Sequence, residues 1–221
     1  MSTESTGPEG SVPAGLRIDR VVTSGTFSLD GGTWDVDNNV WVVGDDDQAV
    51  IIDAAHDAAP ILKAVGDRDV VAIVLTHAHN DHIGVAPELA EATGAPILLH
   101  PADEMLWDRT HPGVAHDELS DGQRIVVGGH ELEVINTPGH SPGSCVVWAP
   151  SANVLFSGDT LFQGGPGATG RSFSSFDDII ASIRDRILVL DPQTRVCTGH
   201  GDETTVGAEA GDLDEWIRRG H

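Results

Sequence analysis

The feature that most constrains this chain is a polar heptapeptide, Thr76-His77-Ala78-His79-Asn80-Asp81-His82, directly after a continuously apolar segment at 70–75. Three histidines and an aspartate within six residues pack poorly, because a buried polar group needs a partner. In an extended loop His77 and His79 point to the same side, so two imidazoles can reach one ion. Imidazole with carboxylate is the ligand mix of zinc and other first-row metals. The segment therefore predicts a metal site at the end of a buried strand.

Short β-rich stretches alternate with helical patterns from residue 16 onward. Apolar stretches at 17–28 and 34–43 flank Asp30-Gly31-Gly32, which indicates a hairpin. The best helical pattern covers 175–188, with acids in its first turn and isoleucines on one face, and another helix is expected at 212–219. The two halves of the chain repeat this scheme. We therefore expect two sheets with outer helices.

The length of 221 residues suits one large domain or two small ones. We predict a disordered tail at 1–15, rich in Ser, Thr, Glu, Gly and Pro, and one domain at 16–221. The two cysteines, Cys145 and Cys197, lie far apart and are expected to be small buried hydrophobes. The longest apolar run is far shorter than the roughly 18 residues that cross a bilayer. No secretion signal stands near the start, so we predict a cytoplasmic protein without membrane contact.

The net charge of the chain limits the classes of partner that it can bind. The chain has 35 Asp plus Glu against 12 Lys plus Arg, a formal net charge of -23. This balance repels a phosphate backbone, and the basic residues are scattered, so nucleic acid is excluded as a partner. A small-molecule substrate is expected instead, and a homodimer remains open.

Further motifs follow the heptapeptide in order. They are Thr137-Pro138-Gly139-His140-Ser141-Pro142-Gly143-Ser144, Phe156-Ser157-Gly158-Asp159-Thr160-Leu161-Phe162 and Thr198-Gly199-His200-Gly201, with Ile51-Ile52-Asp53 upstream. Together these five motifs resemble those of the metallo-β-lactamase superfamily, and the resemblance runs from residue 16 to about residue 207. It implies an α/β fold of the four-layered αββα sandwich type, with the ligands on loops along one edge of the two sheets.

The resemblance also implies a ligand set for two divalent ions, Zn²⁺ first, with Fe or Mn as alternatives. Metal one is held by three histidines and metal two by three other ligands, with one bridging carboxylate: His77, His79 and His140; Asp81, His82 and His200; Asp159. Asp81 and Asp159 are the expected catalytic carboxylates, and Asp53 supports the ligands from behind. Two such ions lower the pKa of water, so no Ser, Cys or Tyr nucleophile is needed. The other six histidines are expected to be structural or superficial: His56, His100, His111, His116, His130 and His221.

Residues that are missing separate the branches of this superfamily. The chain has no tyrosine, which disfavours lactonases, and no cysteine in the third motif, which disfavours the Cys-ligand penicillin-hydrolysing enzymes. The charge disfavours RNA-processing members. What remains resembles single-domain glyoxalase II-like hydrolases, which implies cleavage of a thioester by metal-activated hydroxide. The Lys-poor composition resembles that of small actinobacterial metallohydrolases, and the resemblance implies glutathione or mycothiol as the expected thiol. A mononuclear-iron persulfide dioxygenase is the alternative; a non-catalytic binding module would have lost ligands.

Two residues are candidates for substrate contact. Arg171 follows a glycine-rich loop and could grip a substrate carboxylate, with a plain surface role as the alternative. Asn39, next to Asn38, could present its amide near the substrate, with a turn role as the alternative. His56 lies three residues after Asp53 and could reach the margin of the site.

Overall fold

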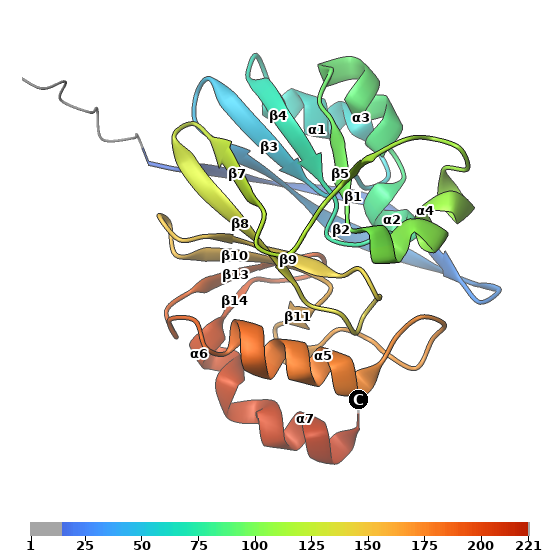
Figure 1. Cartoon of the computed structure of the whole chain (residues 1–221), viewed down its shortest axis with the longest axis vertical. Coiled ribbons are helices and arrows are strands. Elements are labelled where there is room, and N and C mark those ends of the chain that lie inside the picture. The colour runs from blue at the N-terminus through green and yellow to red at the C-terminus, as the bar shows by residue number, and fades with distance from the viewer. Residues whose placement is uncertain (1–14, 221) are drawn as a thin grey trace, which may run out of the picture.

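The computed structural model describes residues 15–220, so the predicted tail, apart from residue 15, and His221 lie outside the described part of the chain. Two six-stranded sheets pack face to face, with α1 to α4 on the outer side of one and α5 to α7 on the outer side of the other (Figure 1). The four layers confirm the expected αββα sandwich.

The first sheet has the strand order β1-β2-β3-β4-β5-β6. Its strands are β1 Arg17–Leu29, β2 Gly32–Gly44, β3 Gln48–Ile52, β4 Asp69–Val74, β5 Ile97–Leu99 and β6 Asp117–Glu118. β1 and β2 form the predicted hairpin, and β3 to β6 run parallel to one another. Asp30 and Gly31 have φ angles of 53° and 80°. Positive φ at both central residues is the two-residue turn that suits the twist of a hairpin.

The second sheet has the order β14-β13-β10-β9-β8-β7. Its strands are β7 Arg124–Val127, β8 His130–Asn136, β9 Cys145–Ala149, β10 Val154–Gly158, β13 Arg195–Thr198 and β14 Thr204–Thr205. β10 and β13 are parallel, and the other pairs are antiparallel. A separate two-stranded ribbon is formed by β11 Leu161–Phe162 and β12 Gly165–Pro166.

The helix expected at 212–219 is present as α7, whereas the one expected at 175–188 is only partly α-helical. The helices are α1 Ala58–Val65, α2 Asn80–Ile83, α3 Ala86–Thr93, α4 Glu104–Thr110, α5 Phe176–Ser182, α6 Val206–Glu209 and α7 Leu213–Arg219. The predicted continuous α-helix at 175–188 is wrong in its second half, where Ile183–Ile187 forms a π turn closed by a bond from Leu188 N to Ile183 O. The spacing of apolar residues cannot distinguish a π turn from an α turn when both bury the same side chains.

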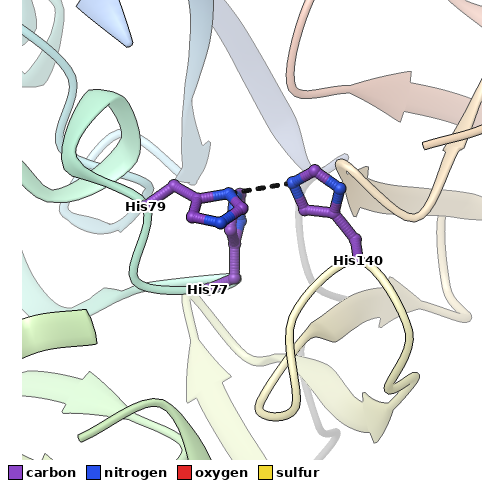
Figure 2. A group of neighbouring side chains, drawn as sticks. All are labelled: His77, His79 and His140. Carbon is purple, nitrogen blue, oxygen red and sulfur yellow. Dashed lines mark hydrogen bonds between the residues drawn. The ribbon is translucent and has the colours of Figure 1, made fainter. Parts of the chain in front are cut away.

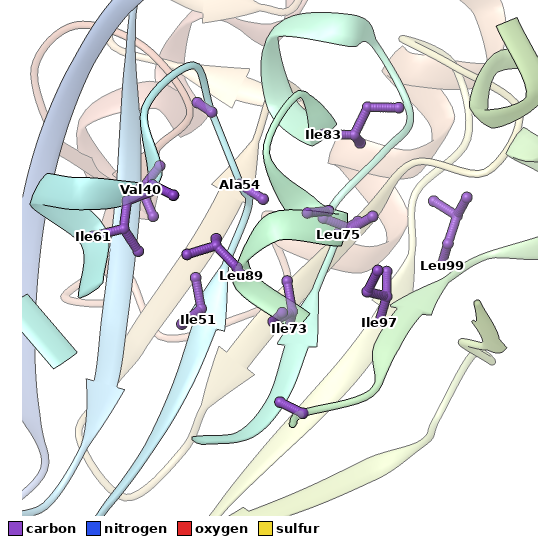
Figure 3. Packing of buried hydrophobic residues seen from close by; sticks show 14 of the residues in the cluster. Val40, Ile51, Ala54, Ile61, Ile73, Leu75, Ile83, Leu89, Ile97 and Leu99 are labelled. Atoms are coloured by element: carbon purple, nitrogen blue, oxygen red, sulfur yellow. The ribbon is translucent and has the colours of Figure 1, made fainter. Parts of the chain in front are cut away.

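Three apolar clusters fill the spaces between the four layers. Side chains alternate across a strand, so Val40 and Val42 of β2 face the helices while Trp41 and Val43 face the other sheet. Figure 3 shows the cluster between the first sheet and its helices, where Ile61 and Leu89 pack on the strands. The third cluster packs the second sheet against α5 and α7. Because both faces of each sheet are buried, the central strands read as continuous apolar runs.

The two cysteines are buried, as expected, and burial raises the pKa of each thiol to about 12. Both therefore remain protonated and unreactive at neutral pH. Within residues 15–220, no helix has the length and hydropathy needed to span a membrane.

Candidate metal centre

Four loops bring the predicted ligands to one edge of the sandwich. The heptapeptide follows β4, His140 lies between β8 and β9, Asp159 follows β10 and His200 follows β13. Parallel strands present their carboxyl ends at a common edge, where ligands bind in such sheets. Gly199 is required beside His200, because a Cβ there would lie 2.2 Å from Asp159 Oδ1. The fold therefore assembles all seven predicted ligands from four separate segments.

Three histidines form the first cluster (Figure 2). His79 Nδ1 lies 3.0 Å from His77 Nε2 and 3.0 Å from His140 Nε2. Around a zinc ion with bonds of about 2.0 to 2.1 Å, neighbouring nitrogen ligands are separated by about 3 Å. The three side chains are almost completely buried and come within reach of one common ion. Their arrangement is that of a cation site.

The second cluster lies beside the first and contains Asp81, His82 and His200. His200 Nε2 is 3.1 Å from His82 Nε2 and 3.3 Å from Asp81 Oδ2. Asp159 reaches both clusters, with Oδ1 3.2 Å from His82 Nε2 and Oδ2 3.6 Å from His140 Nε2. Its position between the clusters is the one that a bridging carboxylate needs.

The hydrogen bonds of the imidazoles determine which nitrogen is free. Four histidines present Nε2 to the clusters and donate Nδ1–H to an acceptor behind them. The pairs are His77 with Thr76 Oγ1 (3.1 Å), His82 with Asp53 Oδ2 (2.8 Å), His140 with Ala168 O (2.9 Å) and His200 with Asp37 O (2.7 Å). Such acceptors fix the tautomer of a metal-ligating histidine. Asp81 Oδ1 is buried without a hydrogen-bond partner within residues 15–220, which also suits a cation. The residues present therefore fit a pair of metal ions.

Burial keeps two imidazoles of the first cluster, His77 and His79, neutral. It lowers the pKa of His77 well below its usual value and that of His79 to about 3. Neighbouring imidazoles act in the same direction, because each disfavours a positive charge on the others. Both rings are thus deprotonated at neutral pH and have lone pairs available for a cation.

The second cluster is charged in the metal-free chain. Burial would lower the pKa of His200, but Asp159 and Asp81 outweigh it and raise that pKa to about 10. The same balance raises the pKa of His82 well above its usual value. Burial would raise the pKa of Asp81, but His82 and His200 lower it to about 2. A cation entering this cluster must displace imidazole protons, so its binding releases protons.

Two buried aspartates hold the ligand loops in place. Asp53, the predicted supporting residue, accepts from Thr76 N at 2.8 Å as well as from His82. Asp103 was not predicted from the sequence. Its Oδ2 accepts from Ala78 N at 2.9 Å and Ser141 Oγ at 2.7 Å, and its Oδ1 accepts from Gly143 N at 2.6 Å. Asp103 therefore joins the heptapeptide to the loop of His140.

Asn38 links His56 to the second cluster. His56 Nε2–H donates to Asn38 Oδ1 at 2.8 Å, which orients the amide so that Nδ2–H donates to Asp81 Oδ2 at 3.0 Å. His56 has a φ of 53°. Its ring packs directly against Gly25, because a Cβ on residue 25 would lie only 2.2 Å from His56 Nδ1. The expectation that His56 reaches the margin of the site is confirmed. Through Asn38 it orients one oxygen of Asp81 and leaves the other free.

We expect Asn38→Ala to weaken metal binding at the second cluster about 10- to 100-fold, the usual loss when a partner of a ligand is removed. The first cluster should keep its ion. The measurement is a titration of the metal-free protein with Zn²⁺. His56→Gln keeps an N–H donor near Asn38 and should lose less affinity than His56→Phe. Two equally tight equivalents in Asn38→Ala would contradict this role.

A cavity of about 280 Å³ opens over the clusters. Its floor is formed by His79, Asp81, His140, Asp159 and His200. One wall comes from the β1–β2 hairpin and the other from β11 and the loop at 168–174. The ligands are thus accessible to a small molecule from one side.

The two predicted substrate residues have different outcomes. Arg171 lines the cavity, with its guanidinium carbon 3.9 Å from the centre of the Trp34 ring. Asn39 does not reach the cavity. Its side chain is buried and donates to the carbonyl oxygens of Thr198 and Gly201 at 3.0 Å each, so it fastens the loop of His200. The prediction for Asn39 is therefore wrong.

Strand alternation separates the two asparagines. Asn38 shares its face of β2 with Val40, on the side of α2 and Asp81, whereas Asn39 shares its face with Trp41. The alternation of side chains along this strand could be read from the sequence. The role of Asp103 had no comparable signal, because a single acidic residue near a helix start is an ordinary feature.

Residues 33–200 match the family model of the metallo-beta-lactamase superfamily. An uncharacterized protein of Aquifex aeolicus is 37% identical over 185 residues, 77% of this chain and 88% of the relative. A probable metallo-hydrolase of Bacillus subtilis, YqgX, is 35% identical over 77% of this chain and 88% of its own length. The hydroxyacylglutathione hydrolase GloC of Haemophilus influenzae is 29% identical over 77% of this chain and 89% of its own length.

Solved structures are also similar to this chain. TTHA1623 in a di-iron-bound form superposes with a TM-score of 0.72 at 33% identity, covering 79% of this chain and 93% of that chain. The B3 metallo-beta-lactamase BLEG-1 superposes with a TM-score of 0.71 at 30% identity, covering 86% of this chain and 97% of that chain.

Proposed function

The chain belongs to the metallo-β-lactamase superfamily, and on that premise we propose that it is a dinuclear-metal hydrolase that cleaves thioesters of a low-molecular-weight thiol. The observation that carries the proposal is the pair of adjoining His/Asp clusters at the floor of a small cavity, with Asp159 between them. Divalent ions in such clusters polarise a carbonyl and lower the pKa of water toward neutrality.

The number of ligands supports two ions over one. A mononuclear iron site of the oxygen-using type needs two histidines and one carboxylate. Here the three-histidine cluster and Asp159 would already satisfy one ion, and the second cluster, in which Asp81 and His82 are buried, would have no occupant. A complete second cluster favours the hydrolase over the persulfide dioxygenase. TTHA1623, which is similar to this chain, holds two iron ions.

A thioester suits the residues around the clusters. A thiol has a pKa near 8.5, so a thiolate leaves without a strong general acid. The described residues that line the cavity include no lysine, tyrosine or glutamate to protonate a poorer leaving group. Arg171 can bind and orient an anionic group on the substrate, while Asn38 and Asp53 hold Asp81 and His82 in position. The likeness to GloC supports the same class of substrate.

β-Lactam hydrolysis is a second candidate, because BLEG-1 is similar over most of this chain. The two candidates differ in the leaving group. A β-lactam amine must be protonated as it leaves, whereas a thiolate need not be.

The test combines elemental analysis of the purified protein with a substrate panel. The panel contains S-lactoyl and S-formyl conjugates of glutathione and of mycothiol, a cephalosporin, and glutathione persulfide with an oxygen electrode. We expect two divalent ions per chain and thioester cleavage without oxygen uptake. One iron per chain with oxygen uptake would establish the dioxygenase, and cleavage of the cephalosporin alone would establish the lactamase.

A further inference from the structure

The distal part of the β1–β2 hairpin forms an apolar wall over the metal-ligand clusters. Phe27 and Trp34 are opposite each other in the hairpin register, and their rings stack with centroids 5.7 Å apart. Leu29 and Val36 are two residues further along the same strands, so they lie on the same face and also line the cavity. The Phe27 ring lies 5.1 Å from that of His79. The wall therefore begins at the first metal cluster and continues outward, where Trp34 is 41% exposed.

A single cation completes this wall. The Arg171 guanidinium lies over Trp34 at 3.9 Å and Phe27 at 5.4 Å, and its N–H groups donate to no acceptor within residues 15–220. Ser172 N donates to Asp30 Oδ2 at 2.9 Å, which ties the loop of Arg171 to the tip of the hairpin. Stacking holds the guanidinium in one plane and leaves its donors available for a carboxylate.

Size and charge limit what this wall can bind. At about 280 Å³ the cavity lies at the lower end of the ~300 to 1,000 Å³ usual for small-molecule sites, which favours one short arm of a thioester as its occupant. The net charge of -23 repels polyanionic substrates, and Arg171 is the one lysine or arginine among the described residues that line the cavity. One carboxylate on an apolar body matches both features.

We propose that the cavity selects thioesters with one flat apolar arm that carries a single carboxylate. Phe27 and Trp34 contact the apolar body, and Arg171 binds the carboxylate. This inference rests on the proposed thioesterase activity. Arg171 and Trp34 are then the residues that determine specificity, while the ligand clusters carry out the reaction.

The test compares thioesters in two series. The first series keeps N-acetylcysteamine as the thiol and varies the acyl arm from acetyl through 3-phenylpropanoyl to 3-(4-carboxyphenyl)propanoyl. The second series keeps an acetyl group and varies the thiol from a small alkyl thiol through a phenyl-bearing thiol to a carboxyphenyl-bearing thiol. In one series kcat/KM should rise at least tenfold from the smallest arm to the carboxyphenyl arm, which also identifies the side that enters the cavity. Arg171→Gln should remove the advantage of the carboxyl group, and Trp34→Ala that of the ring. Arg109→Gln is the matched control, because Arg109 stacks on Phe173 outside this cavity.

Binding separates failure of this inference from failure of the proposed function. The monocarboxylate 4-ethylbenzoate should shift the indole N–H signal of Trp34 in the metal-free protein, and Arg171→Gln should abolish the shift. If no thioester is cleaved but this shift is seen, the proposed activity fails and the selectivity of the cavity stands. If thioesters are cleaved with equal kcat/KM for all arms, or the Trp34 signal does not move, the inference is overturned.

Discussion

Replacing His77 with alanine is expected to reduce metal-dependent turnover at least about 100-fold, since the loss of a ligand should exceed the 10- to 100-fold loss caused by removing a ligand's partner. His77 Nε2 belongs to the three-histidine cluster and lies 3.0 Å from His79 Nδ1. Without His77, only His79, His140 and Asp159 would remain to hold an ion in the first cluster. The measurement is kcat/KM for the preferred thioester beside the metal content of the same sample.

The fold should survive this substitution. His77 lies in a loop at the sheet edge, and the three apolar clusters do not include it. Circular dichroism should therefore match the wild type. His116→Gln is the matched control, because His116 pairs with Glu104 at 2.8 Å, away from the clusters. Full turnover by a His77→Ala protein that contains no metal would refute the proposed mechanism.

Asp103→Ala is expected to lower the free energy of unfolding of the metal-free protein by about 3 to 5 kcal/mol. The carboxylate accepts from Ala78 N, Ser141 Oγ and Gly143 N, and each buried donor left without an acceptor costs about 1 to 3 kcal/mol. Partial entry of water keeps the total below the sum. The measurement is the free energy of unfolding from urea denaturation, with one m-value fitted to both the wild type and the variant.

The same substitution should also weaken metal binding at the first cluster, because Asp103 joins the loop of His77 and His79 to the loop of His140. Asp108→Ala is the control, since Asp108 is an exposed acidic residue of the following helix, α4. A change of less than about 0.5 kcal/mol in Asp103→Ala, the range of ordinary surface substitutions, would show that the carboxylate does not hold these loops together.

Local patterns predicted most of the framework. The turn at Asp30-Gly31 and the continuous apolar strands are readable because each depends on neighbours in the chain. The same holds for the heptapeptide, in which His77 and His79 are two residues apart. The other ligands, His140, Asp159 and His200, were found through their resemblance to a known order of motifs, since spacing alone does not bring such distant residues together.

Contacts between distant segments were less readable. The Asn39 prediction failed because its amide is used by Thr198 and Gly201, whose approach depends on how β13 meets β2. The stacking of Arg171 on Trp34 joins positions that are far apart in sequence, and neither residue type indicates the other. Such contacts depend on loop conformation, which hydrophobic periodicity does not describe.

By itself the sequence determined the kinds of element, the two buried sheets and the inventory of imidazole and carboxylate ligands, because periodicity and residue chemistry are local properties. Only the tertiary structure decided which nitrogen of each histidine faces the clusters, that Asp103 and Asn38 hold the ligand loops, and that an aromatic hairpin with one arginine forms the wall of the cavity. The physical reason is that hydrogen-bond partners and cavity walls come from loops at the ends of different strands, and the packing of the two sheets sets their relative positions.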